Sequence, residues 1–162
     1  FCPALSRLLA DVGESLMPAG RQLHRGGTYL CMEGPAFSTR AESELYRSWG
    51  CSVIGMTNHT EARLAREAEI AYATLAMVTD YDCWHQEHAS VTVEMVIANL
   101  QANASLAQQI VRLAAQRVEA QRPTSSAHQA LRHALMTPKE HVPAATRRKL
   151  DLFTAPYWGP FS

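Results

Sequence analysis

Apolar residues recur at two different spacings in the first half of the chain, and the two spacings predict helices and strands respectively. Between residues 3 and 17, leucines and a valine return every three or four positions, which is helical spacing. Two short apolar runs at residues 28–32 and 51–56, and a longer one at residues 71–79, have the length and composition of buried strands. We therefore expect one leading helix and then three strands.

Helix start and stop signals stand between the expected strands. Thr39 followed by Glu42 fits a capping box, and Gly50 is well placed to end that helix. A further helix is expected to begin at Asn58 or Thr60. Because helices and strands alternate three times, the pattern predicts an α/β domain whose helices cover a largely buried sheet.

A long helix is expected after the third strand. Thr92 is its candidate cap, and the apolar positions that follow recur at helical spacing along one stripe: Val93, Val96, Ile97, Leu100, Ala104, Ala107, Ile110 and Val111. Further on the pattern is less regular, although residues 125–136 and 144–152 still look helical. We therefore divide the chain into a main part, residues 1–120, and a C-terminal extension, residues 121–162.

Composition argues against two classes of partner. The 162 residues include 47% apolar and 19% charged residues, and the formal net charge is zero. A neutral chain lacks the basic face that nucleic-acid binding requires, and no apolar run reaches the roughly 18 residues of a membrane span. The four cysteines are widely spaced and suggest no disulfide framework, so we expect free thiols in a reducing cytoplasm.

Two aspartates at the end of the third expected strand are the first candidates for chemistry. In a strand, Asp80 and Asp82 project from one face, at the carboxyl end where open α/β sheets bind ligands. Close carboxylates repel, which favours keeping one of them protonated as a general acid. The alternative is an acidic pair that only caps a helix or solvates a loop, and the two residues alone leave both interpretations open.

Three segments carry a more specific pattern. They are Met-Glu-Gly-Pro-Ala-Phe-Ser-Thr-Arg-Ala-Glu-Ser at residues 32–43, Val-Ile-Gly-Met-Thr at residues 53–57 and Thr-Asp-Tyr-Asp-Cys-Trp at residues 79–84. In this order and at these intervals they resemble the 5′-methylthioadenosine phosphorylases of the purine nucleoside phosphorylase superfamily. The resemblance covers the chain up to about residue 115 and implies a mixed central sheet flanked by helices, as in that superfamily.

Members of that family are longer, and this chain is similar to their C-terminal half. The chain also opens with Phe1 rather than methionine. We therefore expect an N-terminal half upstream, either in the same polypeptide or as a separate chain.

The resemblance implies a purine site built from four residues. Phe37 resembles the aromatic residue that stacks on the base, and Ser38 resembles a residue that contacts it. Asp80 and Asp82 resemble the pair that recognises a 6-aminopurine, with Asp80 also protonating N7 of the leaving base. The alternatives are that Phe37 is a core side chain after a turn and that Ser38 is only a helix cap.

The ribose, the phosphate and the 5′-substituent are assigned in the same way. Met56 resembles the residue under the ribose, and Thr57 resembles a phosphate ligand near a helix start. Val93 and Val96, one helical turn apart, resemble the apolar pocket for the 5′-methylthio group, facing a neighbouring subunit. Without the resemblance, Met56 would be taken as a core residue. The two valines could equally be plain core, and Asn58 could be only the cap of its helix.

The implied reaction is phosphorolysis of 5′-methylthioadenosine to adenine and 5-methylthioribose 1-phosphate, by a homotrimer that needs no cofactor and uses inorganic phosphate as co-substrate. We expect no metal: Cys83, His85 and His88 are spaced loosely like ligands, but no second cysteine pair completes a zinc site. Two alternatives stay open, a broader purine nucleoside phosphorylase and a non-catalytic half that needs a separate N-terminal chain.

Overall fold

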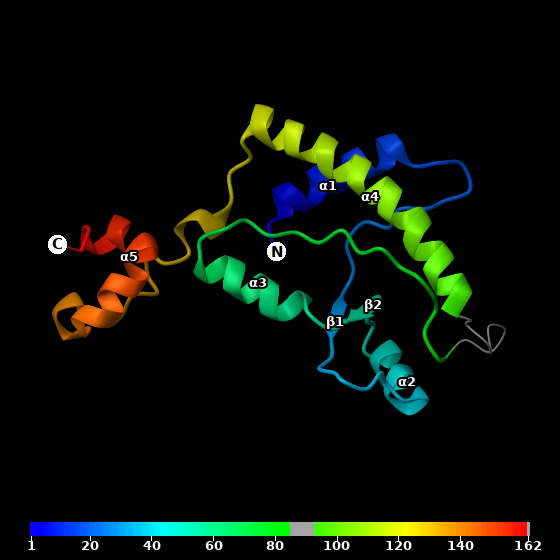
Figure 1. Cartoon of the computed structure of the whole chain (residues 1–162), viewed down its shortest axis with the longest axis horizontal. Helices are drawn as coiled ribbons and strands as arrows, with labels where there is room; N and C mark the ends of the chain where they lie inside the picture. The colour runs from blue at the N-terminus through cyan, green and yellow to red at the C-terminus, as the bar shows by residue number, and fades with distance from the viewer. Residues whose placement is uncertain (85–92, 162) are drawn as a thin grey trace.

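A computed structural model describes residues 1–84 and 93–161. In chain order its elements are α1 (Pro3–Leu16), β1 (Tyr29–Cys31), α2 (Arg40–Ser48), β2 (Val53–Gly55), α3 (Asn58–Glu67), α4 (Val93–Gln121), the 3-10 turns Ser126–Gln129 and Lys139–His141, and α5 (Ala144–Trp158). Figure 1 shows α1 lying along α4, the two strands between α3 and α2, and α5 at the far end. The α/β class expected from the sequence is confirmed.

The sheet of the described residues consists of β1 and β2, which pair in parallel with Tyr29 opposite Val53. Parallel strands need a crossover between them, and α2 forms part of it. Its start is the expected capping box, because the Thr39 side chain accepts from the Glu42 backbone N–H and Glu42 Oε2 accepts from Thr39 N at 2.7 Å. The first two strands and this helix are thus confirmed, although each strand is shorter than the apolar run that predicts it.

The third expected strand is not formed. Residues 71–79 lie outside the two-stranded sheet, and side chains hold much of the segment: the Tyr72 hydroxyl donates to Asn58 Oδ1 at 2.8 Å, and Asn99 and Asn103 donate to the carbonyls of Thr79 and Val78. A strand requires a backbone ladder with a neighbour, and the described residues supply none here. The composition of the segment favours a strand, but pairing is a tertiary property.

The core lies between α1 and α4, and its buried cluster is Leu8, Val12, Ile110 and Ala114. Only part of the stripe expected along α4 is buried: Ile110 is 2% exposed, whereas Ile97 and Val111 are 47% and 56% exposed. Length explains Ile97, since α1 has 14 residues and α4 has 29, so α1 covers only part of its partner. Val111 directly follows the buried Ile110 and is exposed for another reason: successive helical residues point in directions about 100° apart, so it faces away from α1. The expected cap, Thr92, lies outside the described residues.

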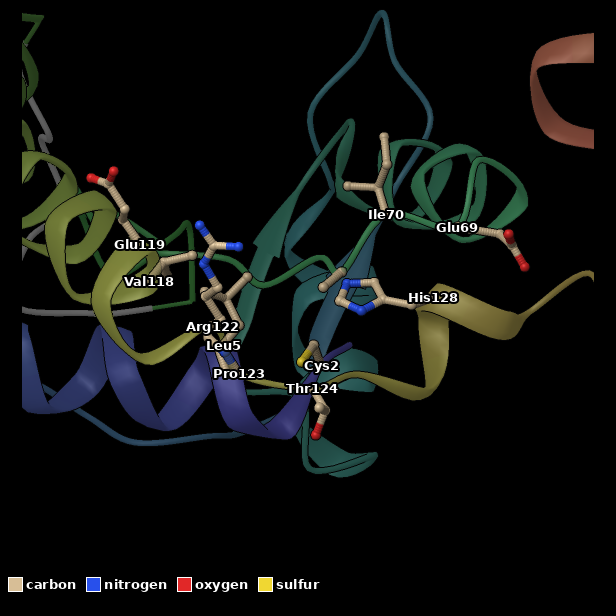
Figure 2. Close-up of a pocket in the computed structure, with 11 residues that line it drawn as sticks. Cys2, Leu5, Glu69, Ile70, Val118, Glu119, Arg122, Pro123, Thr124 and His128 are labelled. Atoms are coloured by element: carbon tan, nitrogen blue, oxygen red, sulfur yellow. The ribbon is translucent and has the colours of Figure 1, made fainter. Parts of the chain in front are cut away.

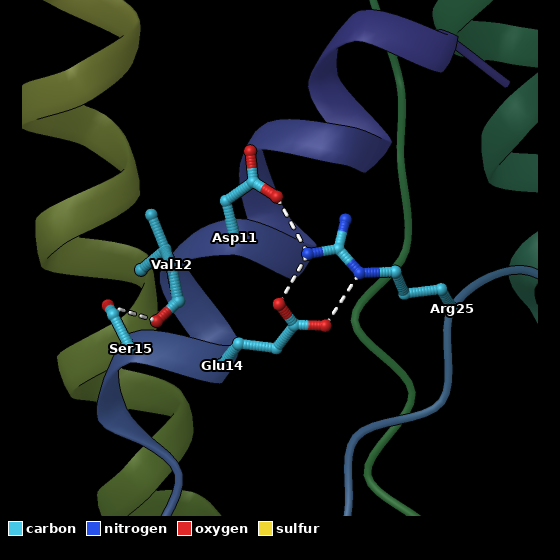
Figure 3. Close-up of polar contacts among 5 residues, drawn as sticks. All are labelled: Asp11, Val12, Glu14, Ser15 and Arg25. Atoms are coloured by element: carbon cyan, nitrogen blue, oxygen red, sulfur yellow. Dashed lines mark hydrogen bonds and ion pairs between the residues drawn. The ribbon is translucent and has the colours of Figure 1, made fainter.

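The loop after α1 is tied back to that helix by one arginine (Figure 3). Arg25 Nη2 donates to Asp11 Oδ1 at 2.7 Å and to Glu14 Oε2 at 2.6 Å, while its Nε donates to Glu14 Oε1 at 2.6 Å. This bidentate pairing lowers the pKa of Glu14. Because all three side chains are exposed, the cluster orients the loop more than it stabilises the fold.

The C-terminal extension departs from the sequence pattern in two ways. Residues 125–136 form a short 3-10 turn and further turns rather than the expected helix. Conversely, α5 runs past its expected end at Leu152 to Trp158, through Pro156. A proline inside a helix removes one backbone hydrogen bond, so contacts with the rest of the chain must offset that loss.

Glu69 makes such a contact at the end of α3. Its Oε1 accepts a hydrogen bond from Leu131 N at 2.9 Å and another from the Tyr157 hydroxyl. The Tyr157 hydrogen bond lowers the pKa of Glu69, and the same bond raises the pKa of Tyr157. One carboxylate therefore fastens both the turns before α5 and the last turn of α5 itself to the main part of the chain.

Loss of this carboxylate is expected to release the C-terminal extension. Because the folded pKa of Glu69 is depressed, its stabilisation is present above the ordinary pKa of 4.5 and disappears as the pH falls through the folded value. In limited proteolysis, the unaltered chain should therefore be cleaved within residues 122–158 faster at pH 3 than at pH 7. The Glu69→Ala variant should be cleaved there at a similar, fast rate at both pH values. Glu67→Ala, on the exposed last turn of α3, is the control and should behave as the unaltered chain does.

Candidate functional site

The carboxyl ends of β1 and β2 bring two of the three characteristic segments together. Met32 N, just after β1, donates to Gly55 O at the end of β2 at 2.9 Å. The Met56 side chain lies against Gly34, so closely that its Cε would be 2.3 Å from a Cβ placed there. Ser38 Oγ in turn lies 3.2 Å from Met32 Sδ. Segments 32–38 and 55–57 thus meet at the edge where parallel sheets bind ligands.

The third segment forms a tight turn that carries both aspartates. Asp80 Oδ1 accepts from Asp82 N at 2.9 Å, and Asp82 Oδ1 accepts from Cys83 N at 2.8 Å. Asp82 has φ +63°, the left-handed region that aspartate tolerates better than most residues. The expectation that the two side chains leave a strand on one face is therefore wrong, because the turn and not strand alternation sets their directions.

Helix α2 holds this turn against the loop that carries Ser38. The buried Ser43 donates its hydroxyl to Asp82 Oδ2 at 2.5 Å, and the Arg47 guanidinium lies 3.7 Å from the centre of the Trp84 ring. Cys83 Sγ is 3.7 Å from Ser38 O. Sequence reasoning gave Ser43 and Arg47 no role; their spacing of four residues on one helix face was the available signal.

The predicted purine-site residues differ widely in exposure. Phe37 is 84% exposed and the Asp80 side chain is also exposed, whereas Asp82 and Ser38 are half-buried. The alternative interpretation of Phe37 as a core side chain is therefore wrong. The alternative interpretation of Ser38 as the helix cap is also wrong, because Thr39 is the N-cap residue of α2.

The residues predicted for the sugar and phosphate flank the start of α3. Met56 is 38% exposed and not a core residue, and Thr57 is the exposed N-cap residue, whose side chain makes no capping hydrogen bond. Asn58, the alternative cap, is instead buried and accepts hydrogen bonds from Tyr72 and Thr74. The Met56 thioether thus lies against the loop after β1, and the Thr57 hydroxyl is exposed at the start of α3.

Other predicted residues lie outside the described part. The backbones of Val93 and Val96 belong to the first turn of α4, but their side chains are not among those described, and neither are His85 and His88. Among the described residues no three His, Cys, Asp or Glu side chains gather as a metal site, and no helix is long and apolar enough to cross a membrane. The four cysteines are free thiols.

Gly55 ends β2 at a place where the structure leaves no room for a side chain. The Tyr29 hydroxyl occupies the space beside it, 1.7 Å from where a Cβ would stand. The two residues lie on paired strands, so the tyrosine fills the place of the absent side chain.

Gly55→Ala is expected to destabilise the fold by about 1–3 kcal/mol, because the added methyl overlaps the Tyr29 ring. Urea unfolding followed by circular dichroism measures the loss. The double variant Gly55→Ala/Tyr29→Leu, which removes the ring, should recover part of it. Strictly additive losses in the double variant would contradict the steric account.

A cavity of about 760 Å³ lies elsewhere, between the start of α1, the end of α3 and the end of α4 (Figure 2). Leu5, Ile70 and Val118 supply apolar lining, and Arg122 and His128 are among its polar groups. None of the predicted site residues lines it. The cavity is therefore separate from the candidate site at the carboxyl edge of the sheet.

Residues 1–116 match the family described as the phosphorylase superfamily. The chain belongs to this superfamily. It is 66% identical over 162 residues to the S-methyl-5′-thioadenosine phosphorylase of Prochlorococcus marinus, and 52% identical over 155 residues to that of Geobacter sulfurreducens. The resemblance inferred from the three segments is thus confirmed, and the Prochlorococcus match extends it through the C-terminal extension as well.

Solved structures of similar proteins share the fold. A methylthioadenosine phosphorylase from an antarctic soil metagenomic library superposes with a TM-score of 0.88 at 46% identity, over 94% of this chain and 53% of that one. The Schistosoma mansoni methylthioadenosine phosphorylase in complex with adenine gives a TM-score of 0.63 at 30% identity, over 74% and 46% of the two chains. The chain spans about half the length of the curated relatives it matches, 52% in the case of Prochlorococcus.

Proposed function

We propose that the chain provides the purine- and ribose-binding part of an enzyme that phosphorolyses 5′-methylthioadenosine. The observation that carries the proposal is the gathering of Ser38, Met56 and Asp82 at one edge of the parallel sheet, in a chain 66% identical to an enzyme of that name. The enzyme is a pentosyltransferase of purine and methionine salvage, and we place it in the cytoplasm.

In this proposal the purine binds beside the Asp80–Asp82 turn. The exposed ring of Phe37 stacks on the base, since a flat base buries well against an aromatic face, and Ser38 contacts the base edge. Asp82 accepts from the exocyclic 6-amino group, and Asp80 donates to N7. A 6-oxopurine presents an acceptor at that position, so this edge selects against it.

The remaining substrate groups bind at the neighbouring loops. Met56 lies under the ribose, and Thr57 binds phosphate with its hydroxyl at the N-terminus of α3, where the helix dipole favours an anion. Val93 and Val96 receive the 5′-methylthio group beside a neighbouring subunit of a homotrimer. No cofactor or metal takes part, and phosphate is the co-substrate.

The chemistry is a displacement at C1′ of the ribose. A phosphate oxygen forms a bond to C1′ while the C1′–N9 bond breaks through an oxocarbenium-like state, and the bonding electron pair goes to the purine. Asp80 transfers a proton to N7 as that charge develops, which stabilises the leaving base. The products are adenine and 5-methylthioribose 1-phosphate.

A second candidate is a binding half that needs a separate N-terminal chain to become active. Three observations favour it. Residues 71–79 carry a strand-like sequence but form no ladder within the described residues, and Val78 in this segment and Ile70 just before it are 60% and 57% exposed. The chain also spans about half the length of its relatives. An apolar extended segment of this kind fits a further strand contributed by such an N-terminal chain.

Adenine release from 5′-methylthioadenosine, with and without phosphate, tests these functions. Phosphate-dependent release by the chain alone supports the first candidate. Release only after addition of the N-terminal half of a relative supports the second, and comparable turnover of inosine favours a broader nucleoside phosphorylase. No release and no adenine binding in either form would contradict the proposal, and native mass spectrometry of the active form tests the trimer.

A further inference from the structure

One contact of the candidate site has no assigned role, the hydrogen bond from Ser43 to Asp82. Ser43 is 2% exposed, lies in α2, and is 39 residues away from Asp82 along the chain. Its hydroxyl donates to Asp82 Oδ2 at 2.5 Å. A buried serine hydroxyl needs a partner, and the carboxylate of a proposed substrate-binding residue is a specific one.

The geometry of this contact fixes the carboxylate from two sides. Cys83 N donates to Oδ1 at 2.8 Å while Ser43 donates to Oδ2, so each oxygen already accepts one hydrogen bond from the protein. A carboxylate oxygen accepts two, which leaves one lone pair on each for a ligand. With both protein partners donating, Asp82 is held as an acceptor in one orientation.

The start of α2 is defined in a way that places Ser43 next to Asp82. Its capping box at Thr39 defines where the helix begins, and Ser43 N donates to Thr39 O at 3.0 Å in the first turn. One turn further on, the Arg47 guanidinium lies over Trp84 at 3.7 Å from the ring centre, next to the aspartate turn. Two residues of one helix face therefore hold the Asp82–Trp84 turn, one by a hydrogen bond and one by a cation–π contact.

We propose that Ser43 is a positioning residue that sets the preference for 6-aminopurines by holding Asp82 as an acceptor. This inference rests on the proposed function, because it requires Asp82 to receive the 6-amino group. Without the serine hydroxyl, the carboxylate turns toward water and the acceptor leaves the position of that group. Adenine then loses a hydrogen bond, whereas hypoxanthine, which has no 6-amino group, loses none.

Calorimetric titration with adenine and with hypoxanthine tests the proposal, in the full chain or in the reconstituted form that binds adenine. Ser43→Ala is expected to weaken adenine binding about 10-fold and hypoxanthine binding less than about twofold, so the adenine preference falls. Ser43→Thr, which keeps the donor, should restore most of the preference. Ser48→Ala, on the exposed end of the same helix, is the matched control and should change neither affinity.

A spectroscopic readout separates positioning from simple loss of structure. In Ser43→Ala, the NMR amide signal of Cys83, whose N–H donates to the same carboxylate, should shift while signals of the α1–α4 core stay in place. If the Ser43→Ala variant bound adenine and hypoxanthine more weakly by the same factor, the role of Ser43 alone would be overturned. An unchanged Cys83 signal together with an unchanged preference for adenine would overturn it as well. Failure of the unaltered protein to bind adenine in either form would overturn the proposed function and this inference with it.

Discussion

Asp80→Asn is expected to lower kcat for phosphorolysis of 5′-methylthioadenosine by about 100- to 10,000-fold, the range that one general acid contributes. Asparagine keeps the shape of the side chain and one oxygen to accept from Asp82 N, which Asp80 Oδ1 does at 2.9 Å. It has no proton to transfer to N7. The turn should therefore persist while the leaving base loses its acid.

Steady-state kinetics in the active form of the protein, alone or reconstituted, measures this effect. KM should change much less than kcat, because binding and turn geometry are kept. Asp11→Asn, which removes an exposed carboxylate paired with Arg25, should leave both parameters unchanged. A kcat within about twofold of the unaltered enzyme would remove Asp80 from the proton transfer.

Ile110→Ala is expected to destabilise the chain by about 2–5 kcal/mol, the usual cost of truncating a buried isoleucine to alanine. Ile110 is 2% exposed and packs with Leu8, Val12 and Ala114, which make up the buried core cluster of the described residues. Truncation leaves a cavity between two rigid helices, which cannot easily close around it. With so small a core, the loss is a large share of the total free energy of unfolding.

The next residue supplies the control for that experiment. Val111 is 56% exposed on the same helix, and Val111→Ala should change the free energy of unfolding by less than about 0.5 kcal/mol in urea titrations followed by circular dichroism. Equal losses at the two positions would mean that the Val111 face of α4 is covered by another surface, and that the core extends beyond the α1–α4 contact.

Local signals along the chain were enough to define the helices near the sheet. The capping box of Thr39 and Glu42 fixed the start of α2, and the regular leucine spacing fixed α1, because capping and amphipathic spacing act within a few residues. The short apolar runs located β1 and β2 for a similar reason. The three segments that resemble the superfamily are also short, continuous stretches of sequence.

Strand pairing and helix ends depended on partners far away in the sequence. The composition of residues 71–79 predicts a strand. A strand forms only when it pairs with a neighbouring strand, and no described segment pairs with it. The helix α5 continues through Pro156 with Tyr157 bonded to Glu69, 88 residues away. A local pattern contains no information about such contacts.

In the candidate site too, some features follow from the sequence and others from tertiary contacts. The sequence by itself determined which residue types are present, Phe37, Asp80 and Asp82 above all, because their identity and order carry the family resemblance. Only the tertiary structure decided their geometry. Because Asp82 has a left-handed backbone, its side chain does not follow the alternation of a strand. The packing of α2 brings Ser43, 39 residues away in the sequence, to the Asp82 carboxylate. Side-chain direction follows from backbone conformation and packing, which no short stretch of sequence specifies.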